Sequence, residues 1–227
     1  MATLFRWLVR LIAVALLALV AGAWIVYYLG SRSLPDYNDQ RQIAGISAPV
    51  EIVRDTADVP HIFGKTDEDV FFALGYAHAQ DRLWQMVVAR LTVQGRLSEL
   101  FGPRTVKSDE LMRRLDLYGL AVRSLTVQDD QTRAALNAYA KGVNAWIGVV
   151  NAEAKGRGAP EFFLFPAEIA VWQPADSIAL MKLLAFQDTA QLQNETLQRQ
   201  ARRPAAKPHP AQSAPLRRSA AAALPPY

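Results

Sequence analysis

Hydrophobic residues follow two different periods along this chain. Between residues 49 and 63 they alternate with polar residues in two short runs, 50–54 and 59–63, separated by a polar turn at 55–58. Alternation with period two is typical of strands that bury one face. Pro60 removes a backbone donor, so we expect the second strand to begin there or to lie at a sheet edge.

After residue 65 the period changes to that of helices. Thr66, followed by Asp69 three residues later, predicts the start of a long helix that ends before Gly95. One face of it should carry Val70, Ala73, Leu74, Ala77, Asp81, Trp84, Val88 and Leu91. Further helices are predicted over 109–125, after Thr126 with an apolar stripe over 135–150, and from Pro174 to a point before Pro204. Residues 161–166 are predicted to form either a short buried turn or an extended piece.

An uncharged run of nineteen residues, 11–29, follows Arg6 and Arg10 near the N-terminus. As a helix it would rise about 28 Å, nearly the thickness of a hydrocarbon core. An uncleaved transmembrane anchor and a cleaved signal peptide, with Ala21-Gly22-Ala23 as the cleavage site, both fit, and the length favours the anchor. The arginines predict residues 1–10 in the cytoplasm and the rest of the chain outside. Residues 30–48 are interpreted as a linker.

Composition narrows the function classes. With 227 residues, 51% of them hydrophobic, the chain can form one domain with a core. The net charge of +4 owes six basic residues to the segment after Glu195, so it does not indicate a nucleic-acid surface. Residues 201–227, rich in Ala, Pro and Arg, are predicted to be a disordered tail. The absence of cysteine excludes disulfides and thiolate metal sites.

The candidate chemistry gathers around Gln80-Asp81-Arg82 inside the first long helix. A buried structural ion pair is the favoured interpretation, with Arg82 or Arg90 as the partner of Asp81. His78 and Asp81 share a helix face and could form a metal pair or a general-base dyad, but spacing selects no third ligand. His61 could act as a base, yet no nucleophile accompanies it, and a hydrogen-bonded, half-buried histidine is more common.

Several ordered motifs resemble the N-terminal part of the penicillin acylase family, from about residue 33 to residue 195. They are Val53-Arg54-Asp55, Val59-Pro60-His61-Ile62, Gly75-Tyr76-Ala77-His78-Ala79-Gln80-Asp81-Arg82-Leu83-Trp84-Gln85-Met86, Gly95-Arg96-Leu97-Ser98-Glu99, Ala138-Tyr139-Ala140-Lys141-Gly142-Val143-Asn144-Ala145-Trp146 and Trp172-Gln173-Pro174-Ala175-Asp176. Asp58 departs from the glycine usual in the family, and aspartate tolerates a positive φ better than most residues.

The resemblance implies a fold and an activity. The fold would be α+β and mainly helical, with residues 49–200 as the α-chain portion of an N-terminal-nucleophile hydrolase. Its αββα core would be incomplete without a β chain, and one transmembrane helix would precede it. Family members hydrolyse linear amides with a β chain whose N-terminal Ser, in a Ser-Asn motif, is the nucleophile and whose α-amine is the base. No Ser-Asn occurs in this sequence, so we expect no catalytic residue in this chain.

Further implications concern a metal, the substrate and the tail. The family's α chain contributes a glutamate to a calcium site shared with the β chain, and that position falls on Glu195. Residues 185–189 would border the acyl pocket but lack the aromatic pattern for a phenylacetyl group, leaving β-lactam side-chain amides, acyl-homoserine lactones and other acyl amides open. The change of composition near Gln200 suggests a truncated or frameshifted fragment. The alternative function is a non-catalytic, membrane-tethered helical module that binds a partner chain through apolar faces.

Overall fold

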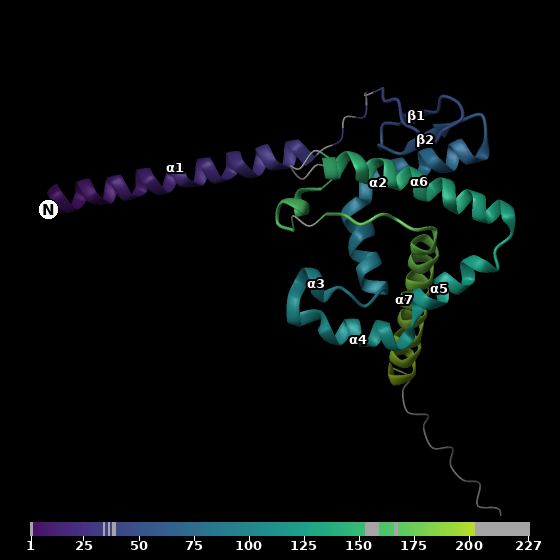
Figure 1. Cartoon of the computed structure of the whole chain (residues 1–227). Helices are drawn as coiled ribbons and strands as arrows, with labels where there is room; N and C mark the ends of the chain where they lie inside the picture. The colour runs from purple at the N-terminus through teal and green to yellow at the C-terminus, as the bar shows by residue number, and fades with distance from the viewer. Residues whose placement is uncertain are drawn as a thin grey trace, which may run out of the picture. The chain divides into compact units, whose positions relative to one another are not determined.

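A computed structural model describes residues 2–33, 35, 37, 40–152, 159–165 and 168–202 (Figure 1). The side chains of residues 29, 32, 33, 163 and 190–202 lie outside this description, as does the predicted tail from residue 203 onward. The chain divides into two units, Met1–Ala185 and Phe186–Tyr227, and the described part of the second is helical. The fold is mainly helical with one small sheet, as predicted.

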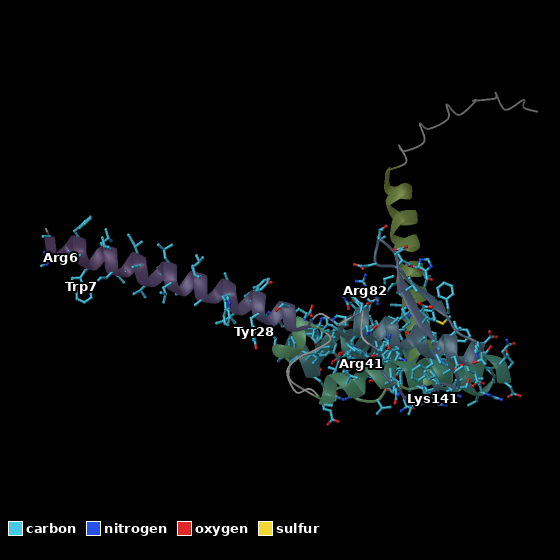
Figure 2. All side chains as sticks on the ribbon, turned by 90° about the horizontal axis from the view of Figure 1, so that it is seen from above. Arg6, Trp7, Tyr28, Arg41, Arg82 and Lys141 are labelled. Carbon is cyan, nitrogen blue, oxygen red and sulfur yellow. The ribbon has the colours of Figure 1, made fainter. Side chains whose placement is uncertain are left out.

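Helix α1, Ala2–Ser33, contains the predicted membrane segment. Its stretch Ala2–Tyr28 is long and apolar enough to cross a membrane. A signal sequence has the same length and apolar character. Its side chains radiate outward around the helix, with Arg6 and Trp7 near one end and Tyr28 near the other (Figure 2). The helix begins earlier and ends later than the run 11–29, and therefore includes residues 30–33 of the predicted linker.

The two predicted strands are present as β1, Glu51–Arg54, and β2, Pro60–Phe63, and they pair with each other as an antiparallel hairpin. Pro60 begins β2, as expected from its missing donor. Asp58 has φ +60°, which confirms that the turn needs a left-handed residue. The carboxylate of Asp55 accepts from the N–H groups of Ala57 and Val59 and so stabilises the turn.

Two long helices, α2 (Asp67–Val93) and α6 (Asp130–Ala152), form the centre of the core. The hydroxyl of Thr66 accepts from the N–H of Asp69, so the predicted cap of α2 is confirmed. The cap of α6 is Asp129, which accepts from the N–H of Thr132, so the predicted start at Thr126 is wrong. Thr126 is instead the last residue of the preceding helix. Asp129 lies closer to the first turn of α6, and its carboxylate accepts from a free N–H group there.

Helices α2 and α6 pack against each other (Figure 1), and two glycines lie at their contact. A Cβ atom on Gly75 would lie 2.1 Å from the carbonyl oxygen of Tyr139, and one on Gly142 would lie 1.8 Å from that of Phe72. Neither distance is possible for a real side chain, so this crossing requires glycine on both helices.

The predicted helix over 109–125 is two helices, α4 (Val106–Leu115) and α5 (Leu117–Thr126). Asp116, at φ +50°, ends the first and caps the second by accepting from the N–H of Gly119. Ahead of them lie α3, Ser98–Phe101, and the short helix η1, Gly102–Thr105, which the pattern did not predict. The buried carboxylate of Asp109 accepts from the N–H groups of Leu97 and Ser98 at 2.8 Å each and joins α3 to α4.

The segment around residue 162 forms η2, Pro160–Phe163, a short 3₁₀ turn. Of the two alternatives predicted for 161–166, a turn or an extended piece, its described residues form the turn. An extended stretch, 168–173, then leads into α7, Pro174–Arg202, which ends before Pro204 as predicted. Two side chains of α6 hold this stretch. Asn144 binds both the N–H (2.6 Å) and the C=O (2.9 Å) of Trp172, and Asn151 binds both groups of Ile169 (3.1 and 3.0 Å).

Candidate functional site

Asp81 meets neither Arg82 nor Arg90, and both of these predicted pairings are wrong. Its carboxylate binds the guanidinium of Arg54, on β1, through two hydrogen bonds of 2.8 and 3.1 Å. Arg82 is exposed and has non-helical angles (φ −138°, ψ 20°) that kink α2 next to Asp81. Asp81 is 23% exposed, so it lies at the margin of the core instead of in the middle of the buried face. Ala73 and Ala77 of the predicted face are buried. The other buried apolar side chains of α2 are Phe72, Tyr76, Ala79, Leu83, Met86, Val87 and Val93.

Tyr37 completes this ion pair from the segment before the sheet. Its hydroxyl donates to Asp81 at 3.1 Å, and its ring lies 3.9 Å below the guanidinium carbon of Arg54. Burial, followed by the charge of Asp81, raises the pKa of Tyr37. Because every member has a partner, the cluster of Tyr37, Arg54 and Asp81 is a joint between three segments rather than a reactive group.

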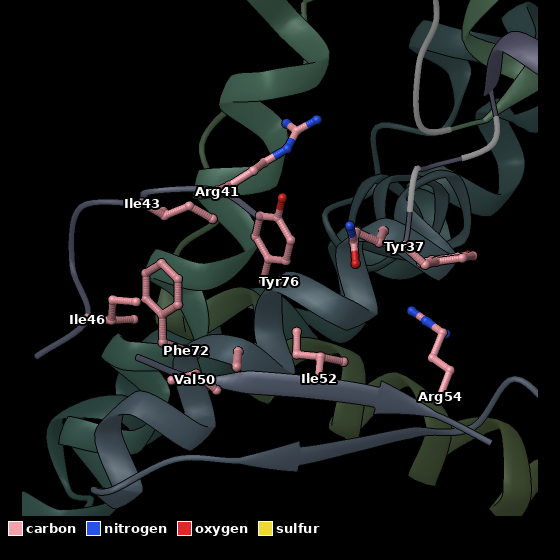
Figure 3. Close-up of a pocket in the computed structure, with 11 residues that line it drawn as sticks. Tyr37, Arg41, Ile43, Ile46, Val50, Ile52, Arg54, Phe72 and Tyr76 are labelled. Carbon is pink, nitrogen blue, oxygen red and sulfur yellow. The ribbon is translucent and has the colours of Figure 1, made fainter. Parts of the chain in front are cut away.

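A small pocket of about 160 Å³ adjoins this joint between β1, α2 and the loop before β1 (Figure 3). Ile43, Ile46, Ile52 and Phe72 line its apolar side, while Arg54 stands at the other end. Its volume is well below the roughly 300–1,000 Å³ of typical ligand pockets.

Arg90 forms an unpredicted ion pair with Asp176, the first-turn acid of α7. The guanidinium lies 3.7 Å from Oδ2, and the two side chains are 6% and 1% exposed. Arg90 also donates to the carbonyl of Ala170 (3.0 Å), and Asp176 Oδ2 accepts from the N–H of Gln173 (2.7 Å). Burial lowers the pKa of Arg90, and the charge of Asp176 opposes that shift. A buried pair with these backbone bonds fixes the start of α7 against α2.

A second pocket, of about 360 Å³, lies beside this pair. Four aromatic side chains, Trp84, Tyr118, Phe162 and Phe165, contribute to its walls. Asp176 Oδ1 accepts no hydrogen bond within the described part of the chain. The phenol of Tyr118 is nevertheless close to this carboxylate. Burial raises the pKa of Tyr118, and the negative charge of Asp176 raises it further.

The two described histidines are both hydrogen-bonded. His78 Nδ1 lies 3.0 Å from the hydroxyl of Tyr139, and burial lowers the pKa of His78. Burial raises the pKa of Tyr139 to about 12. His61 Nε2 lies 3.3 Å from Asp55 at an exposed site. His78 and Asp81 therefore bind different partners, and the described residues hold no group of three or more His, Asp or Glu suited to a metal.

Sequence reasoning missed the residues that carry most of these joints. Arg54 lies in a strand 27 positions before Asp81, too far along the chain for a spacing rule to connect them. Asn144 and Asn151 did offer a signal, two amides spaced two helical turns apart beside an apolar stripe. Glu195 lies on α7, but its side chain falls outside the described residues.

A sequence model of the penicillin amidase family matches residues 49–226, so the chain belongs to this family. The matched range extends past residue 195, where the resemblance in the motifs ends, and past the change of composition near Gln200. The recognition made from the motifs is thereby confirmed.

Curated relatives match about 70% of the chain. It is 37% identical over 155 residues to penicillin acylase 2 proenzyme of Pseudomonas sp. (strain SE83), covering 68% of this chain and 19% of the relative. It is 34% identical over 168 residues to the acyl-homoserine lactone acylase QuiP of Pseudomonas aeruginosa, with coverages of 72% and 19%. It is also 34% identical over 155 residues to penicillin G acylase of Escherichia coli, with coverages of 68% and 17%. The chain thus spans about a fifth of the length of the first two relatives.

Among solved structures, the fold is similar to a thermostable penicillin G acylase from Alcaligenes faecalis. The TM-score is 0.56 at 27% identity, and the match covers 67% of this chain and 84% of that one. Sequence and fold therefore agree on the amidohydrolase family.

Proposed function

We propose that this chain is the α-chain portion of a penicillin acylase-type amidohydrolase, which hydrolyses linear amide bonds together with a β chain. The observation that carries the proposal is the family match over residues 49–226, combined with coverage of only about a fifth of the relatives. The nucleophilic serine belongs to the β chain in this proposal, because the chain contains no Ser-Asn.

The roles of the motif residues support a scaffold function. Arg54 and Asp81 pair with each other, Gly142 allows the crossing of α2 and α6, and Asn144 and Asp176 hold the segment before α7. All of these residues make contacts within the chain. A scaffold of this kind positions its partner's chemistry instead of supplying its own.

The hairpin is the proposed place for the β chain. Among the described residues, each of its two strands has one neighbouring strand, and the outward side chains Val53 and Phe63 are 44% and 59% exposed. Strands with free edges pair readily with further strands. We propose that the β chain adds such strands, which would complete the αββα core.

Calcium remains part of the proposal through Glu195. A carboxylate suits this oxygen-seeking ion, but Ca²⁺ takes six to eight ligands. The described residues hold no cluster that could bind the ion by themselves. The proposed site therefore combines Glu195 with oxygen ligands from the β chain.

The proposed substrates are acyl amides, the class common to relatives named for penicillin and for acyl-homoserine lactones. Residues 185–189 are the proposed border of the acyl pocket. The proposed location is the periplasm, with residues 11–29 as an anchor in the inner membrane or, if cleaved, as a secretion signal.

An amide-hydrolysis assay tests this function. The 227-residue chain alone should show no hydrolysis of a chromogenic acyl amide, and co-expression with the β chain of a close relative should restore it. Hydrolysis by the isolated chain would contradict the assignment of the nucleophile. A β chain that binds without restoring activity would favour the alternative, a non-catalytic tethered module; the exposed Met181 and Leu184 on α7, at 67% and 60%, fit such partner binding.

A further inference from the structure

The loop of residues 160–165, called here the η2 loop, presents an exposed apolar side chain on a firmly packed base. Leu164 is 77% exposed. On either side of it in sequence, Phe162 and Phe165 each place their rings 5.3 Å from that of Trp84. Phe165 also contacts Phe101, which is itself 40% exposed. Leu164 is therefore held outward by packed aromatic neighbours.

The η2 loop lies beside the end of α1. Gly30 and Pro35 line the same pocket as Ala159, Pro160 and Glu161. The membrane-length stretch of α1 ends at Tyr28, and Trp24 stacks on that residue with ring centroids 5.4 Å apart. Paired aromatic residues at the end of an apolar helix are typical of the membrane–water interface.

The chain between α1 and the domain is too short to separate them widely. Residues 28–33 continue as helix for about 7.5 Å. The four residues from Ser33 to Tyr37 can span at most about 14 Å. Tyr37 is fixed to Arg54 and Asp81, and Asp81 lies only three residues before Trp84 on α2. The base of the η2 loop is thus tied to within a short distance of the proposed bilayer surface.

We infer that the η2 loop is a second membrane contact, in which Leu164 enters the boundary between headgroups and acyl chains of the bilayer that holds α1. This inference rests on the proposed anchoring of α1. Glu161 within the loop and Glu168 just beyond it are acidic residues whose carboxylates favour water, so the contact is shallow and does not depend on anionic lipid. The continuity with α1 identifies the occupant of this apolar site as lipid.

Because the chain contains no cysteine, single-cysteine variants can test the inference directly. Leu164→Cys, Leu17→Cys and Val127→Cys would each be labelled with an environment-sensitive fluorophore in the full chain. The labelled chains would be reconstituted into phosphatidylcholine vesicles with acyl chains brominated near the headgroup. Leu17, 74% exposed on α1, reports the anchor, and Val127, 80% exposed, is the matched control. Val127 precedes α6, which rises about 32 Å from Asp130 to Asn151, the residue that binds Ile169 four residues after the η2 loop.

Each outcome decides one point. Quenching at positions 17 and 164, with none at 127, is the expected result. If position 17 is quenched but position 164, like position 127, is not, the inference is overturned and the proposed anchor stands. Absence of quenching at 17 overturns the anchor and this inference together. Quenching at 164 that disappears on co-expression with the β chain would assign the loop to that chain instead of lipid and would also overturn the inference.

Discussion

At the scale of single residues, the most demanding positions are those where an added atom has no space. Gly142 and Gly75 lie in the crossing of α2 and α6, and each faces a backbone carbonyl of the other helix. A flexible side chain could move away from an added methyl group, but a carbonyl within a helix is held by its own hydrogen bond. Substitution here must therefore separate the two helices.

Gly142→Ala should lower the free energy of unfolding by at least about 1–3 kcal/mol, the usual cost of an overpacked core. Gly148→Ala is the control on the same helix, because a Cβ there meets nothing within 4 Å. That control should be neutral or stabilising by up to about 1 kcal/mol, from helix propensity. Urea unfolding followed by circular dichroism measures both variants, and equal effects would contradict the close crossing.

Asp81 shows how far residue-level prediction from the sequence extends. Its place in an apolar helix correctly indicated that the carboxylate needs a base. The base could not be identified, because spacing rules relate residues of one element and Arg54 belongs to a strand. The positive φ of Asp58 agrees with the glycine usual at this position in the family, a signal that the resemblance supplied and spacing did not.

At the scale of elements, the stretch 168–173 is held by side chains instead of a strand. Asn144 and Asn151 each supply one donor and one acceptor, as a neighbouring strand would, and they lie two turns apart on α6. This arrangement fixes where α7 begins. An amide suits this role because Asn and Gln carry an N–H donor and a separate C=O acceptor side by side, which matches the C=O and N–H of one backbone residue.

Asn144→Asp should therefore destabilise the chain by about 1–3 kcal/mol, because the carboxylate keeps the acceptor for Trp172 N–H but cannot donate to Trp172 O. The loss would also show as faster hydrogen exchange at the amide of Trp172. Asn137→Asp, at an exposed position of the same helix, is the control and should change stability little. Unchanged exchange at Trp172 in Asn144→Asp would show that the amide does not hold this stretch.

Element existence was easier to predict than element boundaries. The two strands and the helices α2, α6 and α7 follow from periodicity, from the cap at Thr66 and from Pro174 at the first position of α7. The break at Asp116 was missed because a left-handed aspartate leaves the hydrophobic spacing almost unchanged. The start of α6 was displaced because Thr126 and Asp129 both have the chemistry of a cap, and only the fold shows which one is used.

At the scale of the whole molecule, buried carboxylates join segments that are distant in sequence. Asp69, at the start of α2, accepts from the N–H and the hydroxyl of Ser47 at 2.7 Å each, and so fixes the loop before β1. Asp109 joins α3 to α4 in the same way. The bonds from Ser47 lower the pKa of Asp69; for Asp109, burial raises the pKa, but the bonds from Ser98 and Leu97 outweigh it.

These shifts predict how the stability of the molecule depends on pH. A carboxyl whose pKa is lower in the folded than in the unfolded chain stabilises the fold at pH values above the unfolded pKa of about 3.9. That contribution is lost as the pH falls through the lower, folded pKa. Asp69→Asn should destabilise the chain at neutral pH and flatten the loss of stability below about pH 4, because the proton-linked group is gone. Asp67→Asn, exposed in the same helical turn, is the control. Urea unfolding at a series of pH values measures the slope; an acid limb in Asp69→Asn as steep as in the unaltered chain would show that Asp69 does not link the loop to α2 through its charge.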